Sequence, residues 1–125
     1  RYRRALDDCL KRRIPRAQKE FQEIMDSNPE IPLVENCRYW ISQCRYSAKD
    51  YPAAAAGFQT VLDDTRFAHK DDDASIMLGI TFFQMSRLPE ALDQLHRFVE
   101  SFPKSEYRGK VEQWIERISL IKSRG

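Results

Sequence analysis

One pattern recurs along this sequence at a constant spacing of 37 residues. Prolines occupy one position of the pattern: Pro15, Pro52 and Pro89. Apolar residues of similar size occupy another position, six residues later: Phe21, Phe58 and Leu95. An internal period of about 20 to 50 residues is the signature of a chain built from stacked copies of one small unit. This spacing limits the fold more than any other feature of the sequence.

Each copy of the pattern has the periodicity of two helices. The proline falls in the first turn of the second helix, where its missing N–H costs no hydrogen bond. Apolar residues follow at intervals of three and four, which is the spacing of one helix face. The first helix of the next copy carries a stripe about 100° wide, formed by Cys37, Trp40, Ile41, Cys44 and Ala48. A single pair of helices cannot bury such stripes but stacked pairs can, which predicts a helical solenoid.

The sequence therefore predicts an all-α fold of about seven helices in a single repeat domain, residues 1–125. The expected pairs are 1–28 (helices 1–12 and 15–28), 33–64 (helices 33–48 and 52–64) and 71–101 (helices 71–86 and 89–101). A closing helix is expected at 105–122. Because no apolar run reaches the ~20 residues that a membrane-spanning helix needs, we expect no direct membrane insertion.

Composition and motifs argue against several functions. The chain has 21 Lys and Arg against 19 Asp and Glu, and this net charge of +2 is too balanced to indicate nucleic-acid binding. The basic run from Arg1 to Arg16 is interpreted as a solvated helix face, with a phosphate or an acidic partner as the alternative. The sequence lacks the motifs of phosphate loops, zinc proteases and serine hydrolases. His69 and His96 are interpreted as solvated histidines. We expect no catalytic residue, no metal site and no cofactor.

Three cysteines, Cys9, Cys37 and Cys44, form neither a zinc motif nor a redox motif. On one helix, Cys37 and Cys44 would lie about 10 Å apart, which is too far for a disulfide. The cysteines are therefore interpreted as free, buried thiols that act as small apolar residues.

The C-terminal half of the chain resembles a tetratricopeptide repeat. The positions that carry the resemblance are Leu78-Gly79-x-x-Phe82, Ala91, Leu95, Phe98 and Pro103. The period of 37 residues is longer than the usual length of about 34. The resemblance implies a right-handed superhelix of helical pairs that binds a segment of a partner protein.

Two families within that superfamily share further features with the chain. Residues 35–51 resemble the Glu-Asn-Ala-x-Tyr-Trp segment of the periplasmic Tol-Pal-associated repeat proteins (YbgF/CpoB-like). The Phe102-Pro103-Lys104-Ser105 link resembles that family and also outer-membrane assembly lipoproteins of the BamD type. The first resemblance implies a non-catalytic envelope adaptor. The alternative is a structural module that assembles with itself or with a larger solenoid, as in such a lipoprotein. Both imply the periplasm or cell envelope, with the cytoplasm as the alternative location.

Three residues of the second repeat depart from the family pattern. Ser42 stands where glycine is usual, and Arg38 and Arg45 replace aromatic residues. Such arginines can lay their aliphatic stems over apolar surface. We therefore expect the packing between the first two pairs to differ from the standard repeat.

The first helices of the pairs line the concave face in this architecture. Eleven side chains are expected to project from it and to bind a partner: Asn36, Tyr39, Gln43, Tyr46, Asp73, Ile76, Ile80, Phe83, Lys110, Gln113 and Arg117. Their apolar members would form a groove for a helix or an extended protein segment. The alternative is that Ile76, Ile80 and Phe83 only pack against neighbouring helices. A possible homo-oligomer would instead use the outer face of Trp114, Ile115, Ile118 and Ile121.

Overall fold

The computed structural model describes residues 2–27, 30–64 and 70–124. Within these residues the protein folds into seven helices without a strand, which confirms the expected fold class. The helices are α1 (Tyr2–Leu10), α2 (Ile14–Asp26), α3 (Ile31–Ser47), α4 (Tyr51–Asp63), α5 (Asp71–Gln84), α6 (Leu88–Ser101) and α7 (Arg108–Arg124). Arg1 and His69, considered above, lie outside the described residues.

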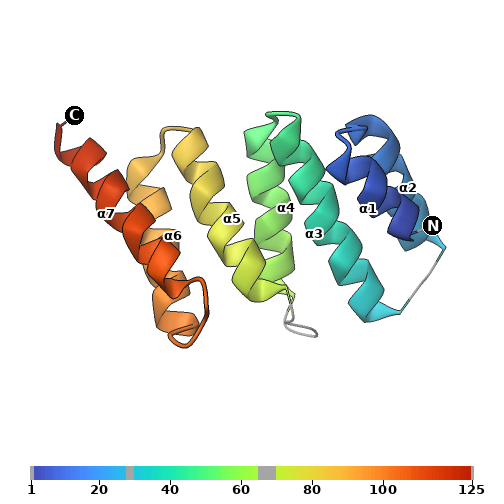
Figure 1. The fold of residues 1–125 in the computed structure, drawn as a ribbon. Coiled ribbons are helices and arrows are strands. Elements are labelled where there is room, and N and C mark those ends of the chain that lie inside the picture. Colours follow the sequence, from blue (N-terminus) through green and yellow to red (C-terminus); the bar gives the residue numbers. More distant parts are fainter. Residues whose placement is uncertain (1, 28–29, 65–69, 125) are drawn as a thin grey trace.

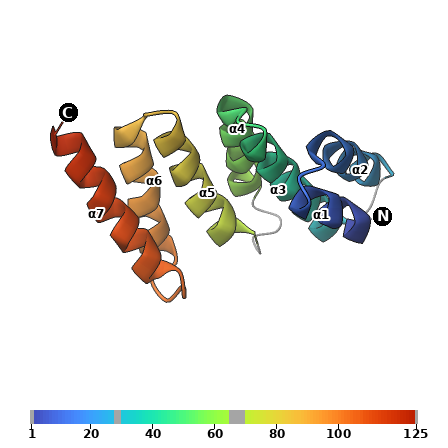
Figure 2. The ribbon, with the colours of Figure 1, turned by 45° about the horizontal axis from the view of Figure 1, so that its top comes forward.

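The helices form two layers that run the length of the molecule. Figures 1 and 2 show α1, α3, α5 and α7 in one layer and α2, α4 and α6 in the other. Each helix packs against the next helix along the chain, and α1 also contacts α3. This is the stack of helical pairs that the repeat predicts.

The turn inside each pair has the same backbone conformation in all three copies. One residue of the turn is left-handed: Arg12 with φ 61°, Lys49 with φ 64° and Ser86 with φ 59°. The next residue then donates its amide N–H to the carbonyl five positions earlier: Arg13 to Asp8, Asp50 to Arg45 and Arg87 to Phe82. This Schellman-type closure ends the first helix. It leaves proline in the first turn of the second helix.

The buried core repeats with the same period as the turns. In the second helices, buried positions recur at Ala17, Ala54 and Ala91 and at Phe21, Phe58 and Leu95. In the first helices they recur at Cys37, Ala74 and Val111 and at Cys44, Thr81 and Ile118. Trp40 is half-buried and packs against both the cluster of α1–α3 and the cluster of α3–α5. Successive pairs therefore share one continuous core.

A glycine permits the close crossing of the two helices in the second and third pairs, but on opposite helices. Ser42 of α3 is buried and donates to the Arg38 carbonyl at 2.9 Å. Opposite it in α4 stands Gly57, where an added Cβ would collide with the Ser42 hydroxyl. In the third pair the glycine is on the first helix, and a Cβ on Gly79 would lie 2.8 Å from Cγ of Leu95. Gly57 therefore compensates for the serine that replaces the usual glycine.

The basic run at the start of the chain is not only a solvated face. Asp8 of α1 is buried, with Oδ1 3.4 Å from Nη1 of Arg13 and Oδ2 3.5 Å from Nε of Arg16. A buried carboxylate needs such charge partners because burial removes its hydration. These two arginines therefore hold α1 against the start of α2.

The closing helix begins later than expected. Helix α7 starts at Arg108, whereas the pattern places its start at residue 105. Ser105 instead forms a turn in which its hydroxyl accepts from the Tyr107 N–H and its carbonyl accepts from the Arg108 N–H, both at 3.1 Å. The serine therefore caps the turn that precedes the helix.

We expect Gly79→Ala to lower the free energy of unfolding by about 1–3 kcal/mol, because the added methyl group would force the buried Leu95 side chain to shift. Urea unfolding followed by circular dichroism measures the change. The matched control is Gly109→Ala in α7, where an added Cβ meets nothing within 4 Å. The control should stay unchanged or gain up to about 1 kcal/mol from helix propensity. Equal losses at both glycines would contradict the close crossing.

Candidate functional site

The eleven side chains expected to bind a partner all come from one layer of helices. Four are on α3, four on α5 and three on α7, and Figure 1 shows these three helices in the same layer. Within that layer the structure places nine of them in two groups. The α3 residues and Asp73 are engaged in contacts inside the protein, whereas Phe83 and the α7 residues form a common surface. The other two, Ile76 and Ile80, are half-buried on α5.

Tyr39 is a core residue, which corrects the expectation that it lines a groove. Its side chain is only 6% exposed, and its ring centroid lies 5.4 Å from that of Trp40 and 5.7 Å from that of Phe58. Gln43 donates from Nε2 to the Tyr39 hydroxyl at 2.8 Å. Burial raises the pKa of the Tyr39 phenol to about 12, although the hydrogen bond from Gln43 opposes the shift. Tyr39 therefore joins α3 to α4 and is not available to a partner.

Lys70 covers the exposed edge of the same aromatic pair. Its Nζ lies 5.3 Å from the Tyr39 ring centroid and 5.9 Å from that of Trp40. It also lies 3.9 Å from Oδ2 of Asp73. Ammonium groups are attracted to aromatic faces, so Lys70 and Asp73 close this part of the layer. Lys70 precedes α5, so the helix periodicity did not predict its place at this site.

Tyr46 and Asn36 are half-buried on α3. The Tyr46 hydroxyl accepts from Nε2 of Gln84 at 3.1 Å, and its ring lies edge-on to Tyr51 at a centroid distance of 5.3 Å. Tyr46 thus connects α3 to the end of α5 and the start of α4. This contact engages the hydroxyl of a side chain that was expected to bind a partner.

Helices α5 and α7 form an aromatic contact at the other end of the layer. Phe83 and Trp114 meet edge-to-face, with ring centroids 5.5 Å apart. The guanidinium carbon of Arg117 lies 5.6 Å from the Trp114 centroid. Ile76 and Phe83 also pack against the core cluster of α6 and α7. Ile76 and Phe83 therefore pack partly against neighbouring helices, as the alternative reading expected. Ile80 is half-buried and does not belong to that cluster.

A shallow hollow of about 200 Å³ lies on α7 and is lined by Lys110, Gln113, Trp114 and Arg117. We call these four residues the α7 hollow. Lys110, Gln113 and Arg117 are exposed, and Trp114 is half-buried. Three of them were expected at the binding face, whereas Trp114 was expected on the outer face that a homo-oligomer would use. The hollow combines two cations with an indole face, which is a suitable surface for an acidic or apolar protein segment.

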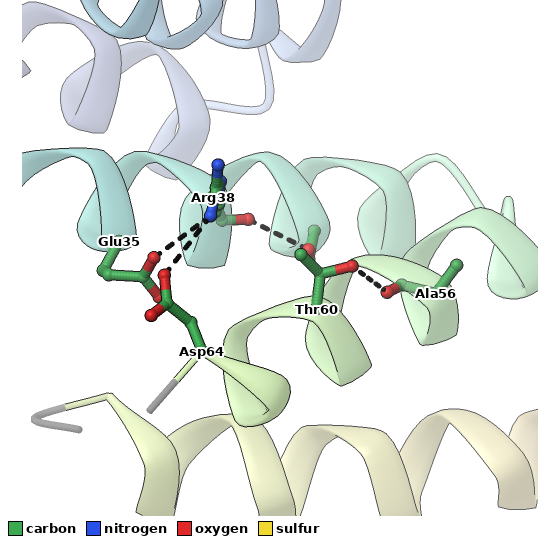
Figure 3. Close-up of polar contacts among 6 residues, drawn as sticks. Glu35, Arg38, Ala56, Thr60 and Asp64 are labelled. Carbon is green, nitrogen blue, oxygen red and sulfur yellow. Dashed lines mark hydrogen bonds and ion pairs between the residues drawn. The ribbon is translucent and has the colours of Figure 1, made fainter. Parts of the chain in front are cut away.

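Arg38 belongs to an ion-pair group whose two carboxylates are buried (Figure 3). Its Nη1 lies 3.2 Å from Oε1 of Glu35 and 3.6 Å from Oδ2 of Asp64. Both carboxylate side chains are nearly inaccessible to solvent. The group connects α3 to the residue that follows α4. The two buried carboxylates share one arginine, so the arrangement is that of a structural link.

The described residues contain no group of three or more His, Cys, Asp or Glu side chains that could hold a metal ion. None of the described helices is long and apolar enough to cross a membrane. The family model described as outer membrane lipoprotein (YfiO) matches residues 1–123. The chain belongs to this family. A comparison with curated proteins finds no match.

Membership of the YfiO family reverses the preference between the two families that the sequence resembles. It supports the BamD-type lipoproteins, which were the second choice, and not the Tol-Pal-associated proteins, which were the first. The family has a helical repeat of the tetratricopeptide type, in agreement with the fold. Its description also connects the chain with the cell envelope. The resemblance in residues 35–51 reflects the packing of a shared repeat, since Tyr39 and Trp40 are both core contacts.

We expect the Tyr39 phenol to ionise near pH 12, well above the ordinary value of about 10. Because the folded pKa lies above the unfolded one, the contribution to stability is complete below pH 10 and is lost as the pH rises toward 12. Absorbance at 295 nm during an alkaline titration measures the ionisation. Tyr39→Phe should remove the late step and lower stability at pH 8 by about 1 kcal/mol through loss of the Gln43 hydrogen bond. A titration in which every tyrosine ionises near pH 10 would show that Tyr39 is exposed.

Proposed function

We propose that this domain is a non-catalytic structural module of an outer-membrane lipoprotein, and that it binds protein partners in the cell envelope. The match to the YfiO family over residues 1–123 is the observation that carries this proposal. A stack of helical pairs supports it, because such stacks offer long continuous surfaces to other proteins. The proposal places the domain in an assembly at the outer membrane and not in a Tol-Pal adaptor.

The titratable groups support a binding role over a catalytic one. The strongest pKa shifts belong to Tyr39 and to the three cysteines, all of which are buried. A catalytic acid or base needs a perturbed group that faces a cleft. The Tyr39 phenol and the cysteine thiols have perturbed pKa values, but they lie inside the core and do not face a cleft.

We infer that the α7 hollow and the neighbouring Phe83 receive the partner. Trp and Arg are the side chains that most often dominate the energy of protein interfaces. Here Arg117 lies over the Trp114 ring, and Lys110 adds a second cation to the hollow. A partner segment with carboxylates flanking an apolar side chain would match this surface, because carboxylates form strong hydrogen bonds with guanidinium groups.

A second candidate is self-association through the end of α7. Leu120 and Ile121 are 54% and 41% exposed, and adjacent exposed apolar residues often mark contact sites. The wider face expected from the sequence is reduced, because Ile118 is buried and Trp114 and Ile115 are only partly exposed. The remaining patch is small, so we rank this candidate second.

Site-specific photo-crosslinking tests the proposed function. A photo-reactive phenylalanine derivative is placed at position 113 in the full-length protein, in cells that express it. The matched control position is 96, because His96 is exposed on α6 in the opposite layer. We expect one discrete adduct with an envelope protein from position 113 and none from position 96. Arg117→Glu should reduce the adduct by about five-fold or more through charge repulsion.

Adducts of equal yield from both positions, or an adduct that Arg117→Glu leaves unchanged, would move the partner site away from the α7 hollow. An adduct between two copies of the chain would favour the second candidate. Sedimentation of Leu120→Ser/Ile121→Ser then decides between the two, since a dimer that persists in this variant does not use the end of α7.

A further inference from the structure

Two cysteines from different helices meet inside the first core cluster. Sγ of Cys44 in α3 donates a hydrogen bond to Sγ of Cys9 in α1 over 3.6 Å. Both thiols are free and buried. Helix periodicity relates only Cys37 to Cys44, which share a helix. The approach of Cys9 to Cys44 depends on how α1 packs against α3, so helix geometry alone could not reveal it.

We propose that Cys9 and Cys44 are an oxidisable pair, and that they form a disulfide between α1 and α3 when the protein folds in the cell envelope. A disulfide places its sulfurs about 2.05 Å apart, so small side-chain rotations would bring the two together. The proposal rests on the envelope location that family membership supports, because disulfides persist in the oxidising periplasm and are rare in the cytosol. It does not depend on where a partner binds.

The oxidant is a thiol oxidant that carries a disulfide of its own. The Cys9 thiolate attacks one sulfur of that disulfide, which forms a mixed disulfide and releases one oxidant thiolate. Cys44 then loses its proton and its sulfur attacks Sγ of Cys9, which forms the Cys9–Cys44 bond and releases the second oxidant thiolate. The cysteine pair gives up two electrons and two protons, and the oxidant receives both. Since the sulfurs are buried in the folded domain, the exchange takes place before α1 has docked on α3.

The surroundings of the three thiols set Cys9 and Cys44 apart from Cys37. Cys9 is the most exposed of them at 9%. In the folded domain the hydrogen bond from Cys44 lowers the pKa of the Cys9 thiol to about 7, so the two thiols interact directly once α1 has docked. The same hydrogen bond raises the pKa of Cys44. Burial raises the pKa of Cys37 to about 11, so Cys37 remains an unreactive thiol.

The disulfide would fasten the first helical pair to the second. Residues 9 and 44 are 35 positions apart, and the closed loop contains α2 and the α2–α3 connection. Closing a loop of that length restricts the unfolded chain and stabilises the folded one. The oxidised protein should therefore melt roughly 10 °C higher than the reduced protein.

The test counts free thiols in the chain after folding in two compartments. The chain is expressed once with an export leader and once in the cytosol, trapped with acid, denatured and labelled with a maleimide polymer. We expect one label on the exported protein, at Cys37, and three on the cytosolic protein. Cys37→Ser is the matched control and should carry none after export and two in the cytosol. Purified chain refolded from urea in reduced and oxidised glutathione should give the same single label, and its mass should fall by two hydrogens.

Three labels on the exported protein would overturn the proposal. A peptide map that links Cys37 to either partner, or that finds glutathione on Cys9 in the refolded chain, would overturn it as well. These results leave the crosslinking at position 113 unaffected, so failure of this inference is distinguishable from failure of the proposed function.

Discussion

The structure depends on contacts between successive helical pairs, because no pair can bury its own apolar stripe. Trp40 shows the constraint most directly, since it packs against the core cluster on either side of α3. Tyr2 of α1 packs against the same core cluster as Trp40. One side chain thus connects α1 to the cluster that reaches α5. In a quasi-one-dimensional stack, stability is approximately the sum of the stabilities of the repeats and of the contacts between neighbouring pairs.

Much of the fold follows from the 37-residue period, because buried positions and helix-starting prolines carry their own chemical signature. The period predicts the seven helices and the residues that face the core. The repeated turn was not predictable, because Arg12, Lys49 and Ser86 adopt left-handed backbones without the glycine that marks them elsewhere. The role of Gly57 was also hidden, since a small residue opposite Ser42 acquires meaning only when α3 and α4 cross.

The candidate site was predicted less well, for a related reason. Helix angles place a residue on a face but do not show how close the next helix comes. Tyr39 lies at the edge of the α3 stripe, and Phe58 of α4 and Lys70 reach far enough to cover it. Among the described helices α7 packs mainly against α6, and the α7 hollow stays open. Residue patterns could not decide between the two families that the chain resembles. Family membership favours one of them and adds the envelope context.

Amide hydrogen exchange in Trp40→Ala tests the central claim, that core contacts between neighbouring pairs hold the stack together. We expect exchange at least about ten-fold faster in α1 to α4, because truncating a side chain that packs between two pairs lowers the free energy of unfolding there by several kcal/mol. Helices α6 and α7 should retain nearly their original protection, since they touch neither core cluster that Trp40 joins. Equal acceleration in all seven helices, or no change in α1 and α2, would contradict it.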